Sequence, residues 1–326
     1  MSPISPATTA VLIATLVVSP GVADVPDTQT GAREKTTRSV YVSVTDNDGQ
    51  PVTKLTPSDF RLRENNRDRV VTTVEPASER MRIVLLVEEL LTPTDSVRQG
   101  ILEFLQATVQ RAEIAFVVVD GTAGNREIVP YTMELNTLVA GIRTLPTPLR
   151  RDAGLVPEGI FEIATTFARE PPERPVIVVI AMALNAPDQR TQQQPQGVLN
   201  RLRDGSAQLH VVSVQAPRSP GAANDTRYPA NDPLGRVGDP NFPVPEPNDR
   251  AEVLTRGPRQ SGGGLWPINV LAGVPSAMRS IANDLSNQYK LTYELPAGVR
   301  PSDRLDVSIN RRGVTLRAPT RIRTPE

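Results

Sequence analysis

Short, almost wholly apolar runs alternate with amphipathic stretches through the middle of the chain. Such runs are typical of strands that are buried on both faces of a parallel sheet, and they cover residues 82–87, 114–119, 175–184 and 208–214. Between them, apolar residues recur at helical spacing, as they do at Val97, Ile101, Leu105 and Val109. Residues 127–132 are expected to form an antiparallel edge strand. Together these patterns predict an α/β domain over residues 80–288, with a mostly parallel, Rossmann-like central sheet and helices on both faces.

Strict alternation of apolar and more polar residues, which is typical of half-buried strands, marks the segments on either side of this domain. On the N-terminal side the apolar positions are Val40, Val42 and Val44, and on the C-terminal side the same pattern covers residues 289–295 and 305–309. Each of these segments is too small to bury an apolar face alone. We therefore expect residues 38–76 and 289–322 to pair into one small β subdomain.

The first 37 residues carry the pattern of an export signal. An apolar block, Ala10–Val18, is followed by small residues that would allow cleavage after Ala23. We expect residues 1–23 to be a signal peptide, residues 24–37 to be a linker, and the mature chain to be periplasmic or extracellular without insertion into a membrane. No Lys or Arg precedes the block, so a disordered apolar tail or an uncleaved anchor is the alternative.

A proline-rich segment interrupts the α/β pattern. Eight prolines lie between Ala216 and Arg250, interspersed with Asn, Asp and Gly. Neither a helix nor a strand accommodates that composition. We expect residues 216–260 to be a disordered insert of the α/β domain, with Tyr228 and Phe242 as aromatic residues that a partner would contact.

Composition excludes several functional classes. Lys plus Arg and Asp plus Glu both number 36, so the chain lacks the positive charge expected of a nucleic-acid binder. The lack of cysteine excludes disulfides and thiolate metal sites, and a single histidine excludes multi-His metal sites. We expect no cofactor.

Enzymatic motifs are missing from the sequence as well. The one histidine, His210, lies inside an apolar strand, where a structural role is expected rather than a place in a Ser/His/Asp triad. There is no Gly-x-Ser-x-Gly elbow, Walker loop or dinucleotide fingerprint. The glycines after Ser261 either cradle an anion or form a hinge. We therefore predict that the chain is not an enzyme, with a hydrolase as the remote alternative.

The strand at residues 82–87 runs directly into two carboxylates, Glu88 and Glu89. In α/β sheets the carboxyl ends of the parallel strands form the edge where ligands bind. Adjacent residues of a strand point in opposite directions, which disfavours a glycosidase pair of carboxylates. If further oxygen ligands surround the two carboxylates, they belong to a divalent-metal site. If not, this edge of the sheet has another use.

The order of the segments resembles that of von Willebrand factor A (VWA) proteins, in particular the VWFA-related group common in Acidobacteria. The stretch VYVSVTDNDGQPVTKLTPSDFRLREN resembles that group's valine-rich strand with its Asp-x-x-Gly, Pro-Val and Asp-Phe. Ser261-Gly-Gly and the stretch YKLTYELP from Tyr289 resemble its closing segment. The resemblance covers nearly all of the chain after the linker, and it implies a VWA fold that binds proteins.

The resemblance also implies where a metal-ion-dependent adhesion site would lie. The family's first loop reads Asp-x-Ser-x-Ser, and the matching residues here are Glu88, Leu90 and Thr92. One hydroxyl ligand is thereby replaced by leucine, and the longer glutamate would reach into the space of the ion. The third loop of the family supplies an Asp, but residues 181–183 are Ala-Met-Ala and Asp188 follows too late.

The family's second loop carries a Thr ahead of Leu-Tyr-Asp-Ala, and Thr147 to Asp152 resembles it with one extra residue. Because a hard divalent ion needs several oxygen ligands at short range, we expect this degenerate site to bind no metal. Arg150 and Arg151 lie in the second loop. Either a guanidinium neutralises Glu88 and Glu89 in place of the ion, or all four charges are solvated.

These features predict an exported, non-catalytic protein-interaction protein of adhesion or scaffold type that does not depend on metal. Its partner is an unidentified protein, and the expected binding rim consists of Glu88, Glu89, Thr92, Thr147, Arg150, Arg151 and Asp152. The competing hypothesis is a purely structural scaffold that makes its contacts through the β subdomain or the proline-rich insert. A metal-dependent adhesion protein is a weaker alternative.

Overall fold

The computed structural model describes residues 36–120, 124–146, 155–182, 193–215 and 249–324. These residues form one six-stranded sheet with its helices, and a β subdomain that contains a four-stranded and a three-stranded sheet. Within these ranges, no helix is both long enough and apolar enough to cross a membrane.

The six-stranded sheet has the strand order β10-β9-β8-β5-β6-β7. Neighbouring strands are parallel except at one edge, where β7 runs antiparallel to β6. The strands are β5 (Met81–Glu88), β6 (Ala112–Val119), β7 (Asn125–Thr132), β8 (Arg174–Met182), β9 (Gln208–Val214) and β10 (Gly264–Ile268). The central strands are apolar almost throughout because both faces of the sheet are covered. The predicted mostly parallel sheet with one antiparallel edge strand is confirmed.

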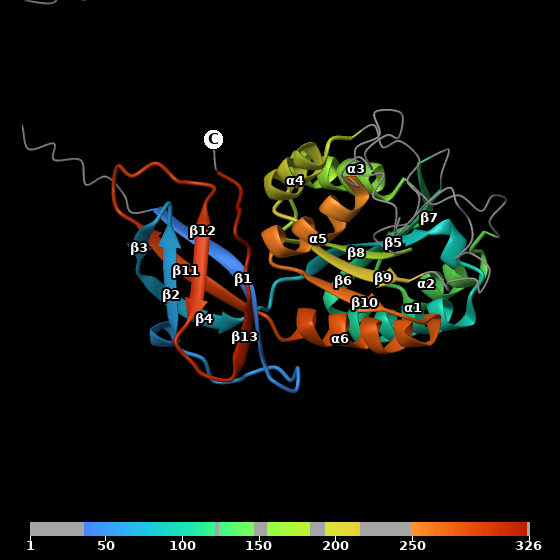
Figure 1. The fold of residues 1–326 in the computed structure, drawn as a ribbon, viewed down its shortest axis with the longest axis horizontal. Coiled ribbons are helices and arrows are strands. Elements are labelled where there is room, and N and C mark those ends of the chain that lie inside the picture. Colours follow the sequence, from blue (N-terminus) through green and yellow to red (C-terminus); the bar gives the residue numbers. More distant parts are fainter. Residues whose placement is uncertain (1–35, 121–123, 147–154, 183–192, 216–248, 325–326) are drawn as a thin grey trace, which may run out of the picture. The chain divides into compact units, whose positions relative to one another are not determined.

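Helices cover both faces of this sheet (Figure 1). The helices α1, α2 and α6 contribute to the core on one face, and α3, α4 and α5 contribute to the core on the other. They are α1 (Asp95–Thr108), α2 (Leu135–Arg143), α3 (Val156–Arg169), α4 (Pro195–Asp204), α5 (Asp249–Ser261) and α6 (Val274–Ser286). Each helix buries one face against the sheet. The helical spacing in the sequence did not indicate α2 or α5.

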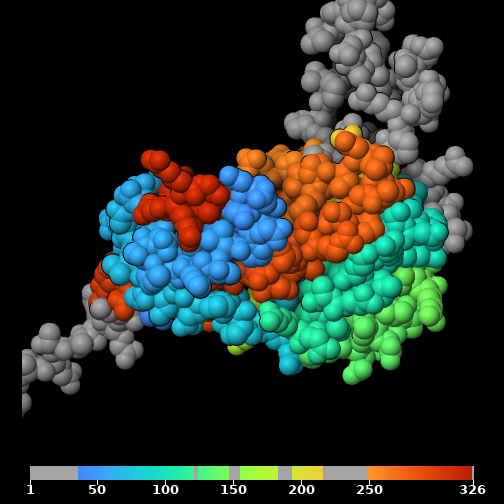
Figure 2. Space-filling model, turned by 90° about the horizontal axis from the view of Figure 1, so that it is seen from below, coloured from blue at the N-terminus to red at the C-terminus, as the bar shows by residue number. Residues whose placement is uncertain are grey.

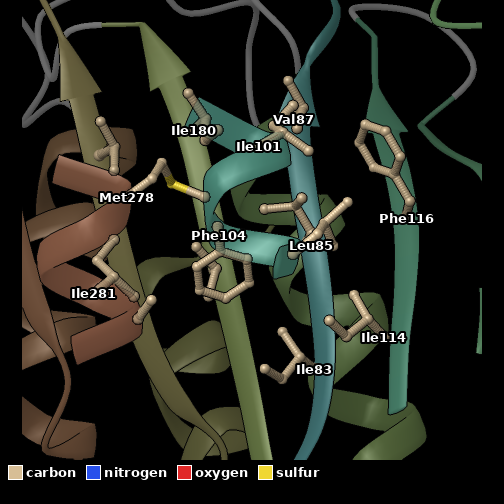
Figure 3. Close-up of a cluster of buried hydrophobic side chains, with 14 of the residues drawn as sticks. Ile83, Leu85, Val87, Ile101, Phe104, Ile114, Phe116, Ile180, Met278 and Ile281 are labelled. Carbon is tan, nitrogen blue, oxygen red and sulfur yellow. The ribbon is translucent and has the colours of Figure 1, made fainter. Parts of the chain in front are cut away.

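Strand β5 lies in the interior of the sheet and sends alternate side chains into two separate cores. Ile83, Leu85 and Val87 belong to the core on the side of α1 and α6 (Figure 3). Val84 and Leu86 belong to the core on the opposite face. Because β5 is packed on both faces along its length, the fold fixes the position of Glu88, its last residue.

The β subdomain is built from the N-terminal and C-terminal segments of the described chain. Strand β1 (Thr36–Asp46) pairs antiparallel with β11 (Tyr289–Leu295) and with β13 (Val314–Arg317). The other strands are β2 (Phe60–Glu64), β3 (Arg67–Arg69), β4 (Val71–Pro76) and β12 (Leu305–Ile309). Figure 2 shows the blue N-terminal atoms and the red C-terminal atoms of this subdomain side by side. The predicted pairing of the two segments is confirmed.

The structure differs from the sequence expectation at the end of the proline-rich segment. Residues 249–261 form α5, although the insert was expected to extend to residue 260. The apolar pattern of this helix is short, since Val253 and Leu254 are the only large aliphatic residues that it buries. Strand β10 was not anticipated either, because its short sequence contains a proline.

The glycines that follow α5 are required by close packing. Gly262 has a φ of +81°, a conformation that residues with a side chain rarely adopt. A Cβ atom on Gly263 would lie 1.9 Å from the carbonyl oxygen of Leu209. This close approach of two backbones accounts for the glycines without an anion and without a hinge.

Candidate functional site

The last residue of β5, Glu88, forms an ion pair with Arg250 from the first turn of α5. Arg250 Nη2 lies 2.6 Å from Glu88 Oε2, and both side chains are fully buried. Charge-assisted hydrogen bonds of this length are among the strong ones in proteins. The carboxylate at the family's first-loop position is therefore neutralised by a residue of the chain itself.

The same carboxylate also binds the end of the neighbouring strand β8. The backbone N–H of Met182 donates to Glu88 Oε2 at 2.6 Å, and Arg250 Nη2 donates to the carbonyl oxygen of Met182 at 3.3 Å. One carboxylate and one guanidinium thus connect the carboxyl ends of β5 and β8 to the start of α5. This is the edge of the sheet where α/β folds place their ligands.

Thr92, the second matching residue of the first loop, is fully buried. Its Oγ1 lies 2.7 Å from the carbonyl oxygen of Glu89 and 2.6 Å from that of Pro146. Its own carbonyl oxygen accepts a hydrogen bond of 3.1 Å from Arg98 Nε. The hydroxyl therefore ties the first loop to the segment that leads into the second loop.

Glu89 begins a short 3-10 helix (Glu89–Leu91) and has a separate partner on the surface. Arg126 Nη2 of β7 lies 2.9 Å from Glu89 Oε1, and the exposed fractions of the two side chains are 49% for Arg126 and 17% for Glu89. An exposed pair of this kind contributes about 1 kcal/mol at most to stability. The pair leaves a carboxylate and a guanidinium accessible at the rim.

The remaining residues of the predicted rim, Thr147, Arg150, Arg151 and Asp152, lie outside the described residues, and so does Asp188. The hypothesis that Arg150 or Arg151 neutralises the glutamates therefore stays a prediction. Arg250 was missed by the sequence analysis because it directly follows the proline-rich stretch. The sequence did offer one signal, because Arg250 lies one helical turn before Val253 and Leu254, the two aliphatic residues that α5 buries.

The described residues do not suit a hard divalent ion at this position. Glu88 is engaged by a guanidinium and a backbone N–H, position 90 is a leucine, and the Thr92 hydroxyl contacts two carbonyl oxygens. Such an ion needs several oxygen ligands around it. Within the described ranges, no group of three or more His, Cys, Asp or Glu residues is arranged to hold a metal.

His210 has the structural position expected of it. The ring is fully buried in β9, stacks on Trp266 with a centroid distance of 5.6 Å, and has Nδ1 4.0 Å from Asp284 Oδ2. Burial lowers the pKa of His210 to about 4, although the charge of Asp284 acts in the opposite direction. The imidazole is therefore neutral at pH 7 and lies in the core rather than at the rim.

The fold and the site together define an α/β domain with a VWA-like fold, in which the carboxyl edge of the six-stranded sheet holds the internal ion pair of Glu88 and Arg250. The strand order and the antiparallel edge strand agree with the VWA fold that the sequence resemblance implied. No protein-family profile matches the chain, and no curated protein sequence does.

Solved structures to which this chain is similar include those of three proteins. Proximal thread matrix protein 1 from the mussel byssus is 10% identical with a TM-score of 0.42, over 66% of this chain and 49% of that chain. BatB from Bacteroides thetaiotaomicron is 14% identical with a TM-score of 0.39, over 64% of this chain and 100% of that chain. The vWF domain of the type V pili tip protein Mfa5 from Porphyromonas gingivalis is 8% identical with a TM-score of 0.40, over 64% of this chain and 96% of that chain. The chain thus spans about half the length of the mussel protein.

Proposed function

We propose that this chain is an exported, non-catalytic protein-interaction protein that binds its partner at the carboxyl edge of the six-stranded sheet without a metal ion. The observation that carries this proposal is the buried pair of Glu88 and Arg250. In a metal-dependent adhesion site the ion compensates the loop carboxylates. Here a guanidinium has that role, so the loops are held in place without an ion.

The rim offers charged groups that suit a protein partner. Glu89 and Arg126 lie partly exposed beside the buried pair, and the predicted rim continues through Arg150 and Arg151. Opposite charges at the margin of an interface contribute to partner choice and to the association rate more than to affinity. Export is supported by the apolar block Ala10–Val18.

A thermal-shift titration tests the independence from metal. An ion present at 100 times its Kd would raise the free energy of unfolding by about 2.7 kcal/mol. We expect no change in the melting temperature with millimolar Mg²⁺ or Ca²⁺, compared with NaCl at the same ionic strength. A selective rise with either ion would contradict the proposal, above all if Glu88→Gln abolished it.

A pull-down from the native envelope fraction tests the rim. The surface variants Glu89→Ala, Arg126→Ala and the double variant Arg150→Ala with Arg151→Ala are compared with Arg312→Ala, which lies in the exposed turn between β12 and β13. We expect the rim variants to lose proteins that the wild type and Arg312→Ala retain. Equal retention by all variants would support the scaffold alternative instead.

A further inference from the structure

A second site lies at the opposite end of the sheet from the rim. A cleft of about 290 Å³ opens beside the amino ends of β8 and β9, between α4, α5, β1 and the segment after β13. This volume is near the lower limit for small-molecule pockets, roughly 300–1,000 Å³. We call it the arginine cleft, and its defining residues are Arg38, Tyr41, Arg174, Arg203, Arg321 and Arg323.

The lining of the arginine cleft is rich in arginine, although Arg38 is paired with the buried carboxylate of Glu64. Five arginines line it, and Glu173 is the only carboxylate among the lining residues. Arg174 is buried and has neutral partners: its Nη2 donates to the carbonyl oxygen of Leu285 and, at 2.8 Å, to Gln288 Oε1. Its Nε is also buried and makes no hydrogen bond with any described group. Burial lowers the pKa of Arg174 to about 10, so the guanidinium is still charged at pH 7.

The mouth of the cleft carries further cations. Arg203 Nη1 and Arg321 Nη1 both contact one carboxylate oxygen of Asp303, at 3.3 and 2.7 Å, and Arg203 Nη2 also lies 2.8 Å from Asp204 Oδ1. Arg323 is exposed, and its guanidinium has no partner among the described residues. Arg323 at the mouth and Arg174 toward the base, neither of which has a carboxylate partner among the described residues, therefore favour anionic groups in the cleft.

One wall of the cleft is an open strand edge. Over residues 36–42 strand β1 pairs with β11 alone, because β13 joins its other side only from Ser43 onward. Gln208 Nε2 reaches the carbonyl oxygen of Tyr41 from that other side at 3.5 Å. Backbone groups alternate in direction along an antiparallel strand, so Ser39 and Tyr41 both turn theirs away from β11. Both residues line the cleft.

We propose that the arginine cleft binds a short, extended, acidic peptide segment that adds to the open edge of β1. The backbone N–H and carbonyl of Ser39 and the backbone N–H of Tyr41 supply main-chain hydrogen bonds, as in other cases of strand addition, whereas the carbonyl oxygen of Tyr41 already accepts from Gln208. Arg321 and Arg323 pair with carboxylates of the peptide, as guanidinium groups do with bidentate geometry. An inorganic anion would use the arginines but would leave the strand edge unpaired, and this difference allows the two kinds of ligand to be distinguished.

Fluorescence anisotropy with the full chain tests this site. The probe is a fluorescein-labelled hexapeptide of alternating Glu and Val, and the control probe has Lys in place of Glu. We expect saturable binding of the acidic probe alone. Methylation of alternate backbone nitrogens of the probe should weaken binding by about tenfold or more, because it removes main-chain hydrogen bonds.

Variants of the protein locate the site. The double variant Arg321→Ala with Arg323→Ala should also weaken binding by about tenfold or more, whereas Arg312→Ala and the rim variant Glu89→Ala should leave it unchanged. Both replaced arginines are exposed, and an unchanged melting temperature shows that the variant is folded. Absence of saturable binding, equal binding of the methylated probe, or equal binding by the double variant would overturn the proposal. The pull-down with the rim variants tests a different surface, so its failure would not change the interpretation of the peptide-binding experiment.

Discussion

Arg250 Nη2 lies 2.6 Å from Glu88 Oε2 in the interior of the protein, although the two residues are 162 positions apart in the chain. Removing two charges from water is costly, and the cost is offset only when geometry and further hydrogen bonds are good. Met182 supplies those further bonds through its backbone N–H and carbonyl oxygen. The pair therefore fixes where α5 begins relative to the sheet.

Removing only one member of this pair should be strongly destabilising. Arg250→Met removes the buried guanidinium that binds the Glu88 carboxylate, and we expect the free energy of unfolding to fall by about 3–5 kcal/mol. The double variant Glu88→Leu with Arg250→Met should recover most of that loss, because it buries no charge. Urea unfolding measures both, with Glu89→Ala as the control that costs about 1 kcal/mol or less. A small effect of Arg250→Met would mean that the pair is accessible to water.

The single histidine should make stability depend on pH. The unfolded chain takes up a proton at His210 below about pH 6.5, whereas the folded protein does so only near the lowered pKa of about 4. The free energy of unfolding should therefore fall as the pH drops from about 6.5 to about 4, by about 3 kcal/mol from this residue. Chemical unfolding at several pH values measures how the free energy of unfolding changes with pH. His210→Gln should remove the contribution of the histidine to that change. An imidazole NMR signal that titrates near pH 6.5 would contradict the prediction.

Two glycines offer a matched pair of substitutions. Gly263→Ala places a Cβ against the backbone of Leu209, and we expect a loss of about 3 kcal/mol or more in the free energy of unfolding. Gly197→Ala in α4 meets nothing within 4 Å and should stabilise the protein by roughly 0.5–1 kcal/mol, because alanine loses less backbone entropy on folding. Thermal and urea unfolding compare the two variants directly. Equal effects would show that the backbones at Leu209 and Gly263 are able to separate.

A buried glutamine joins three polar side chains. Gln288 Nε2 donates to Ser43 Oγ at 3.1 Å and to Gln208 Oε1 at 3.0 Å, and its Oε1 accepts from Arg174. Gln288→Leu should cost about 1–3 kcal/mol, because it leaves buried partners without their hydrogen bonds. Gln99→Leu is the control, since Gln99 is exposed and its side chain donates to Glu103 on the surface. Similar unfolding curves for the two variants would argue against a cooperative network.

The sequence predicts the sheet well because burial on both faces leaves an unambiguous pattern. The apolar run at residues 208–214 coincides with β9, and the alternation at residues 289–295 coincides with β11. Helix α5 gives a weak signal, because its buried face includes Arg250, Gly257 and Pro258. The position of Glu88 at the edge follows from local pattern alone. Its partner does not, since the choice among 36 basic residues depends on three-dimensional packing.

The antiparallel ladders of β1 have a mechanical consequence. They place Thr36 opposite Leu295 and Ser43 opposite Arg317, so the first strand of the described chain is joined directly to two of its C-terminal strands. Tension applied between residues 36 and 324 would load these ladders first. The force would pass from β1 through the ladders to the C-terminal strands. The α/β domain lies between β4 and β11 in the chain, outside this path, and would bear no force while the ladders remain paired. A molecule pulled at both ends would therefore keep its rim undistorted until the β subdomain opens.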